Sequence, residues 1–307
     1  MAKVDLSVDL GGLKLRSPLV TASGCFASGR EMSEFIDLKR LGAIVVKSMT
    51  LKPWAGKATP RMAETSSGML NAIGLQNKGV DHFLSTDLPW LTEQKVPVIA
   101  SIAGNTTQEF MQVAERLRSA PIHAVEVNIS CPNLEDRNNM FAHDPQATSA
   151  VISAVRRMVD VPIFAKLSPN VTSLTAIAGA ALEAGAHGLS LINTVMAMAI
   201  DVDSATPKVA GVVGGLSGPA IKPIAVRAVF EVHQAYPHVP IIGMGGVMDA
   251  RDVIEFVLAG ASAVALGTVN FINPKAGHEI LSDLEQFLSN RKVGSLAAIR
   301  GQVKVEG

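Results

Sequence analysis

Polar side chains stand at the ends of several otherwise apolar stretches of this sequence. Lys47 and Lys166 each end such a stretch, and Cys131 follows another in the motif NISCPN. Lysine is almost never buried without a partner, so two lysines at the ends of separate stretches favour an anionic ligand over side chains that merely reach solvent. A cysteine beside a polar loop can act as an acid and base, or can pack as a small hydrophobe. The residues alone leave both interpretations of Cys131 open.

Glycines cluster at three places in the second half of the chain. The clusters contain Gly218, then Gly245 with Gly246, and then Gly267 with the adjoining Thr268. Glycine allows a backbone to approach a ligand closely, and free N–H groups at the start of a helix bind phosphate. Ordinary turn glycines explain each cluster separately but explain the recurrence of all three less well. The pattern predicts a cofactor that carries a phosphate, without saying which one.

Other kinds of site find little support in the sequence. The seven histidines show no metal-ligand spacing, so we expect no metal. The chain has no C-x-x-C motif and only two cysteines, so it cannot hold an iron–sulfur cluster of its own. Cys25, the second cysteine, has no polar residues grouped around it in the sequence and is interpreted as structural.

Eight short apolar stretches, rich in valine and isoleucine, alternate with helical segments along the chain. The stretches are 18–24, 43–50, 97–104, 124–131, 162–168, 188–194, 240–246 and 263–268. The helical segments lie near 31–40, 79–94, 106–119, 145–159, 172–184, 219–235, 249–259 and 275–289. This alternation predicts an α/β fold, a (β/α)₈ TIM barrel formed by one domain over residues 1–307. A doubly wound open sheet is the rival fold, but its G-x-G-x-x-G turn is absent.

Four further segments have expected places in such a barrel. Residues 4–15 are interpreted as a hairpin, turned by Gly11 and Gly12, that plugs the bottom of the barrel. Residues 51–76 and 195–217 follow the second and sixth strands, so both insertions should lie on the catalytic face. Residues 132–144 are polar, follow the fourth strand and resemble a mobile lid.

The composition argues against several classes of partner. The chain has 307 residues, is 48% hydrophobic, and has 27 basic residues against 27 acidic ones. We therefore expect neither nucleic acid nor an anionic membrane as a partner. No signal peptide and no apolar stretch of membrane-spanning length is recognised. Because the cysteines form no disulfide framework, we expect a protein of the reducing cytoplasm.

Seven motifs at the expected strand ends together resemble those of dihydroorotate dehydrogenase. They are ASGCF (22–26), NAIGLQN (71–77), NISCPN (128–133), KLSPN (166–170), INT (192–194), GGLSGPAIKP (214–223) and IIGMGG (241–246). The resemblance extends from about Val4 to about Leu288. A cysteine in NISCPN resembles the soluble class of the family. The GLQN and GGLSGPAIKP motifs are most similar to its NAD-linked subclass, whose catalytic subunit works with a separate iron–sulfur flavoprotein.

The resemblance implies the oxidation of dihydroorotate to orotate in pyrimidine (UMP) biosynthesis. Cys131 would be the base that removes the proton from C5, and the hydride at C6 would pass to FMN bound in this chain. Electrons would then reach NAD⁺ through the partner, which would carry FAD and a [2Fe–2S] cluster. The expected assembly is a heterotetramer of two catalytic and two electron-transfer subunits.

The matching motifs also imply which residues bind each ligand. For FMN they are Ser23, Lys47, Ser48, Asn128, Lys166, Ile192, Gly218, Gly245, Gly246, Gly267 and Thr268. For dihydroorotate and orotate they are Lys47, Asn71, Ala72, Ile73, Gly74, Leu75, Asn128, Asn193 and Thr194. The resemblance places Lys166 near the N1–C2=O edge of the flavin, where its charge stabilises the reduced ring.

This sequence departs from the family pattern in three places. Ser101 stands where the subclass usually has asparagine, the segment 134–137 (LEDR) replaces the glycines expected in the lid, and the chain after Val293 is short. These departures bear on a flavin contact, on lid motion and on the contact with a partner subunit.

Three other functions fit parts of the same pattern. One is a self-sufficient enzyme of this fold that reduces fumarate. A second is a flavin enzyme that reduces another pyrimidine or a uridine in RNA, although the neutral charge argues against the RNA form. A third is a non-catalytic barrel that binds a phosphate ligand or serves as a scaffold, which would be colourless where a flavoenzyme is yellow.

Overall fold

Eight parallel strands form the centre of the computed structural model, which describes residues 4–130 and 141–304. In chain order they are β3 (Leu19–Thr21), β4 (Ile44–Val45), β7 (Val98–Ile102), β8 (Ala124–Asn128), β9 (Ile163–Lys166), β10 (Gly188–Leu191), β15 (Ile241–Met244) and β16 (Ala263–Leu266). Neighbours in space follow the order β4, β7, β8, β9, β10, β15, β16 and β3. Most are short and fully buried, as expected of strands covered on both faces.

The sheet closes on itself between its first two strands. Val20 forms a parallel bridge with Ala43, and the Gly42 amide donates to the Leu19 carbonyl at 2.7 Å. The Thr21 hydroxyl donates to the carbonyl oxygen of Val45 at 3.1 Å and accepts from its amide at 2.8 Å. The predicted (β/α)₈ barrel is therefore confirmed, and the open doubly wound sheet is excluded.

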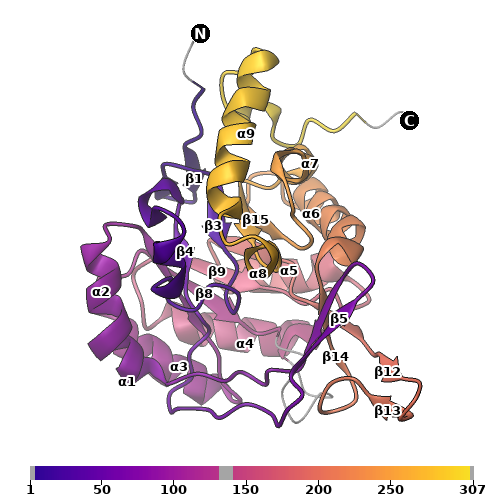
Figure 1. Ribbon diagram of the computed structural model, residues 1–307. Coiled ribbons are helices and arrows are strands. Elements are labelled where there is room, and N and C mark those ends of the chain that lie inside the picture. The colour runs from indigo at the N-terminus through magenta and orange to yellow at the C-terminus, as the bar shows by residue number, and fades with distance from the viewer. Residues whose placement is uncertain (1–3, 131–140, 305–307) are drawn as a thin grey trace.

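Helices surround the barrel and connect most of its successive strands (Figure 1). They are α1 (Val80–His82), α2 (Leu88–Glu93), α3 (Thr107–Leu117), α4 (Pro145–Arg156), α5 (Leu174–Glu183), α6 (Lys222–Ala235), α7 (Ala250–Ala259), α8 (Val269–Ile272) and α9 (Ala276–Asn290). A wider turn over Phe83–Asp87 joins α1 to α2. The Thr106 hydroxyl accepts from the Glu109 amide at 3.1 Å and so caps the start of α3. Within the described residues, no helix is long and apolar enough to cross a lipid bilayer.

The helix predicted over 31–40 is wrong. The segment forms two short 3₁₀ turns instead, Glu31–Glu34 and Leu38–Arg40. Asp37 between them has an extended backbone, with ψ of 107°, and its carboxylate accepts from the Lys39 amide at 3.0 Å. Aspartate competes with the helix by bonding to nearby backbone, and here that local bond begins a new turn.

The N-terminal hairpin closes one end of the barrel, as predicted. Strands β1 (Val8–Leu10) and β2 (Leu13–Leu15) pair across Gly11 and Gly12, whose φ values are +67° and +98°. Leu10, Leu13 and Leu15 belong to the same apolar cluster as residues that point inward from the barrel strands. Gly11 lies against His187 and Pro240, which directly precede β10 and β15. The hairpin thus covers the ends where strands begin, and the opposite end remains for a site.

The two long insertions build a second sheet at that opposite end. The first contains β5 (Met62–Thr65) and β6 (Gly68–Asn71), and the second contains β11 (Val195–Ala197) and β14 (Gly214–Ser217). They form one antiparallel sheet in the order β11, β14, β6 and β5. A small ribbon, β12 (Ile200–Asp201) with β13 (Thr206–Pro207), extends from the second insertion (Figure 1). Their place on the catalytic face was predicted, whereas their pairing with each other was not.

Candidate active site

A cavity lies where the barrel strands end and the insertion sheet begins. Two adjoining hollows make it up, and both are lined by Ser23, Cys25, Lys166, Asn193 and Thr194. The first hollow is also lined by Lys47, Ser48, Asn71, Ile73, Leu75 and Asn128. The second is also lined by Ile192, Gly218, Gly245, Gly246, Gly267 and Thr268. Residues predicted for substrate thus gather on one side and those predicted for a phosphate on the other.

Two predicted residues do not line the cavity. Ala72 is fully buried and Gly74 faces Lys57, so that a Cβ on Gly74 would lie 2.8 Å from the Lys57 Cγ. Their neighbours Ile73 and Leu75 do line it. Ala72 packs in a small apolar cluster instead, and the backbone turns at Gly74, whose φ is +70°.

Lys166 is held by partners inside the barrel. Its side chain is 4% exposed and its ammonium group donates to the Ser23 hydroxyl at 2.9 Å. The Ser23 hydroxyl in turn donates to Glu126 Oε1 at 2.7 Å, and Lys166 Nζ lies 3.9 Å from the same oxygen. The lysine therefore presents a positive charge at the cavity with its position fixed by a buried carboxylate.

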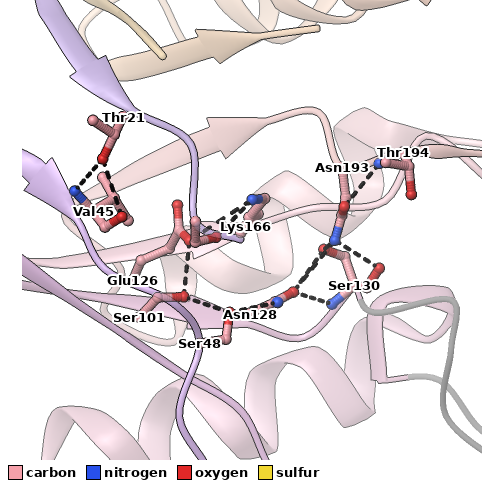
Figure 2. A network of polar contacts seen from close by, with 11 residues as sticks. Thr21, Val45, Ser48, Ser101, Glu126, Asn128, Ser130, Lys166, Asn193 and Thr194 are labelled. Carbon is pink, nitrogen blue, oxygen red and sulfur yellow. Dashed lines mark hydrogen bonds and ion pairs between the residues drawn. The ribbon is translucent and has the colours of Figure 1, made fainter. Parts of the chain in front are cut away.

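The amides of Asn128 and Asn193 form a linked array beside this lysine (Figure 2). Asn128 Nδ2 donates to the Ser48 hydroxyl at 3.0 Å, and the Ser130 hydroxyl donates to Asn128 Oδ1 at 3.2 Å. Asn193 Nδ2 donates to the carbonyl oxygen of Ser130 at 3.0 Å, and Asn193 Oδ1 accepts from the Thr194 amide at 2.8 Å. Each amide is oriented by its neighbours, which prepares the array for a ligand with alternating donors and acceptors.

Cys25 belongs to this site, contrary to its interpretation as a cysteine without polar surroundings. The residue is partly exposed, but its thiol is enclosed, and burial raises the pKa of that thiol. The positive charges of Lys166 and Lys47 act on the same thiol and oppose the effect of burial on its pKa. The two lysines predicted to face one ligand therefore do line the same cavity, and both act electrostatically on the Cys25 thiol.

The glycine clusters bring three backbone segments into close approach. Gly218, Gly245 and Gly246 have φ values of +95°, +131° and +77°. A Cβ on Gly246 would lie 2.7 Å from the Gly218 carbonyl oxygen, and one on Gly218 would lie 2.6 Å from the Cα of Gly68. These positions accept no side chain without a shift of the backbone.

The same region offers backbone donors to an anion. Within the described residues, the amides of Gly246, Gly267 and Thr268 have no hydrogen-bond acceptor. The loop after β15 is held by residues of α6 and α7. Asp252 accepts from the Met248 amide at 2.7 Å and pairs with Lys222 at 2.5 Å. Amides held in this way, with two lysines across the cavity, fit a flavin that carries a phosphate.

Several lining residues were missed by the sequence reasoning. Met62, Met69 and Ser217 come from the insertion sheet and Phe271 from α8. Buried Glu126 was also missed, although a lone acid inside the apolar strand AVEVN is a visible signal. Ser101, the departure from the family pattern, is fully buried and donates to Glu126 Oε1 at 3.0 Å. No group of three potential metal ligands is found among the described side chains.

Cys131 lies outside the described residues, as does the segment 132–140 of the predicted lid. On one side of the gap, Ser130 is buried and its hydroxyl accepts from Asn193 Nδ2 at 2.9 Å. On the other side, Phe141–His143 form a short turn in which the Ala142 amide donates to the Ile129 carbonyl at 3.2 Å. The described residues that flank Cys131 in sequence therefore lie next to the amide array.

Comparisons with known proteins agree over almost the whole chain. A family model described as dihydroorotate dehydrogenase matches residues 5–288. A protein of Geotalea daltonii is 48% identical over 306 residues, which cover 99% of this chain and 100% of the relative. One of Anoxybacillus flavithermus is 52% identical over 284 residues, or 92% of this chain and 91% of the relative. Both relatives are named dihydroorotate dehydrogenase B (NAD(+)), catalytic subunit.

Proposed function

The chain belongs to the dihydroorotate dehydrogenase family, and on that premise we propose how its residues divide the work of the family's reaction. It oxidises dihydroorotate to orotate in pyrimidine biosynthesis, as the FMN-binding catalytic subunit of an NAD⁺-linked enzyme. These roles are assigned from the shared cavity. Gly218, Gly245, Gly246 and Gly267 line one side of it, and the amide array lines the other.

The glycine side is proposed to hold FMN. Gly218, Gly245, Gly246, Gly267 and Thr268 would surround its phosphate, because their segments approach one another closely and offer free amides. Ser23, Ser48, Asn128, Lys47, Lys166 and Ile192 would border its ring. When bound, FMN supplies the acceptor for the hydride that leaves C6 of dihydroorotate.

The amide side is proposed to bind the substrate. Asn71, Asn128, Asn193 and Thr194 would hold the ring and carboxylate of dihydroorotate, and Lys47 would add a positive charge. Ile73 and Leu75 would border the ring with their side chains, and Ala72 and Gly74 would shape that segment from its other side. The donors and acceptors of an asparagine amide match those of a pyrimidinedione.

Cys131 is proposed as the base that removes the proton from C5. The support is its position in sequence, directly after Ser130, whose hydroxyl and carbonyl both bind Asn193 of the amide array. An unperturbed thiol has a pKa of about 8.5, so about a few per cent of it is thiolate at neutral pH, and this fraction grows as the pH rises. The lid 132–144 would exclude water from this proton transfer.

A partner subunit transfers the electrons onward, and we propose its content and number. It would carry FAD and a [2Fe–2S] cluster, as the similarity to the NAD-linked subclass implies, and this chain itself has only two cysteines and no C-x-x-C motif. Two catalytic and two electron-transfer subunits would form a heterotetramer, located in the cytoplasm.

Absorption spectra of the purified chain test these proposals. We expect a yellow protein whose flavin absorption is bleached by dihydroorotate in the absence of oxygen, and NAD⁺ reduction only after the partner is added. Turnover of dihydroorotate with fumarate by the chain alone would contradict the NAD⁺ assignment, and a colourless chain would contradict bound FMN. The native mass of the co-expressed complex measures the subunit ratio.

A further inference from the structure

Glu126 is a buried acid to which the proposed function gives no role. It lies in the middle of β8, where it is 1% exposed. Its Oε1 accepts from Ser23 at 2.7 Å and from Ser101 at 3.0 Å, whereas its Oε2 is buried without a hydrogen-bond partner among the described residues. Burying a carboxylate is costly unless it is paired and hydrogen-bonded. A buried carboxylate with one oxygen left without a partner therefore calls for a functional explanation.

The counter-charge of Glu126 is Lys166 on the neighbouring strand. The ammonium group is 3.9 Å from Oε1, and the Ser23 hydroxyl stands between them as acceptor from the lysine and donor to the glutamate. The register of β8 and β9 sets Asn128 opposite Lys166, so Lys166 ends β9 while Glu126 lies two residues before the end of β8. Glu126 therefore determines both where the ammonium group stands and how much of its charge is offset.

The same carboxylate begins a chain of contacts that reaches the amide array (Figure 2). Ser101, a donor to Glu126, is 2.9 Å from the Ser48 hydroxyl, and Ser48 accepts from Asn128. Side-chain networks in a low-dielectric interior hold their members in fixed geometry. Glu126 is thus fixed on two sides, by the lysine and by the serines.

We propose that Glu126 is a positioning residue that acts through Lys166 to lower the reduction potential of bound FMN. The inference rests on the proposed placement of the flavin ring beside Lys166. An ammonium group next to the ring stabilises the negative charge of its reduced form, and a carboxylate behind that ammonium group weakens the effect. The pair therefore tunes the potential to a value below that set by the lysine alone.

The test is the midpoint potential of FMN in Glu126→Gln, measured at neutral pH against a reference dye. Glutamine keeps an oxygen that accepts from Ser23 and Ser101 but removes the charge. We expect a higher potential, by the equivalent of a tenfold or larger change in the reduction equilibrium, which is about 30 mV for a two-electron couple. A purely structural brace predicts an unchanged potential in every molecule that retains FMN, and that result would overturn the inference.

A matched control removes the same charge far from the cavity. Glu115 is exposed on α3 and is not among the buried residues of that helix, so Glu115→Gln should leave the potential at the wild-type value. If Glu126→Gln does not yield folded protein, Glu126→Asp keeps the charge but withdraws it by one methylene group. We expect a smaller rise in potential for this variant, and no rise would overturn the inference.

The paired variant Glu126→Gln with Lys166→Met separates this inference from the placement of the flavin. It removes both charges, so it leaves no uncompensated ion in the interior. If Lys166 stands beside the flavin, the paired variant has a lower potential than Glu126→Gln alone. If the potential of the paired variant is below that of wild type while the potential of Glu126→Gln equals it, only the role of Glu126 is refuted. If both variants match wild type, the proposed flavin placement fails as well.

Discussion

At the residue scale, two thiols are candidates for the base that removes the C5 proton. Cys25 lines the cavity, and Cys131 follows Ser130 in sequence. Burial raises the pKa of the Cys25 thiol despite the nearby lysines, so Cys25 forms thiolate less readily than an ordinary cysteine. A protonated thiol cannot accept the C5 proton. The electrostatics of Cys25 therefore disfavour it as the base, which supports the proposal that Cys131 has this role.

The two cysteines are distinguished by paired alanine variants. We expect Cys131→Ala to retain FMN and to lose flavin reduction by dihydroorotate by about 10²-fold or more, the usual contribution of a general base. Cys25→Ala should still be reduced by dihydroorotate. Stopped-flow absorbance without oxygen measures both rates, and Cys131→Ser should recover partly at high pH. A Cys131→Ala variant that is reduced at the wild-type rate would transfer the role elsewhere.

Individual site residues were predictable where a charge or amide ended an apolar stretch. Lys47 and Lys166 were placed in one site because the carboxyl ends of parallel strands meet at one face of a barrel. Glu126 was not, since its signal lies inside a strand and its partner is on another strand. Ala72 and Gly74 were predicted from their motif alone, whereas Ala72 packs in a buried apolar cluster and Gly74 faces Lys57 instead of the cavity.

At the scale of elements, glycines in two different segments control different sides of the cavity. Gly246 combines a φ of +77° with close contact to the Gly218 carbonyl, at the proposed phosphate site. Gly215 in β14 lies against the Thr194 side chain, and a Cβ there would also come within 3.3 Å of Asn71 Nδ2. The first glycine therefore shapes the proposed cofactor side and the second shapes the proposed substrate side.

Alanine at each glycine should separate the two binding events. Gly246→Ala forces strain at a left-handed backbone position, so we expect most of the protein to purify without FMN. Gly215→Ala displaces Thr194 and Asn71, so it should retain FMN and raise the KM for dihydroorotate by about tenfold, which corresponds to about 1.4 kcal/mol. Flavin content and steady-state kinetics measure the two effects. Equal losses of FMN in both variants would contradict the division of the cavity.

Elements with regular hydrophobic patterns were predicted well, and those made by long-range pairing were not. Each barrel strand was predicted from a short apolar stretch, because a strand buried on both faces is apolar along its whole length. The insertion strands β6 and β14 pair across more than a hundred residues of sequence, and Asn71 Nδ2 donates to the Gly215 carbonyl at 3.1 Å. No local pattern encodes such a pairing. The segment 31–40 has a helical pattern, but the hydrogen bond that the Asp37 carboxylate accepts from the Lys39 amide decides its structure.

At the scale of the whole molecule, histidines help to begin two of the barrel strands. His187 Nδ1 accepts from the Ile163 amide at 3.0 Å at the start of β9, and His123 Nδ1 accepts from the Val98 amide at 3.1 Å at the start of β7. A protonated ring cannot accept these bonds. Burial, with a further contribution from the positive charge of Arg156, lowers the pKa of His187 below its usual value.

This arrangement predicts a loss of stability in mild acid. With its pKa lowered in the folded state, His187 takes up a proton more readily when the chain is unfolded, so stability rises with pH in this range. Its contribution is complete above the ordinary histidine pKa of about 6.5 and declines as the pH falls toward the folded value.

His187→Asn offers an oxygen that accepts from Ile163 without titrating. We expect its free energy of unfolding to change less between pH 7.5 and 5.5, by up to one proton in slope, as measured by urea denaturation. The exposed His238 serves as control, since His238→Asn should retain the full slope. A wild-type slope in His187→Asn would show that the acid response of the barrel arises elsewhere.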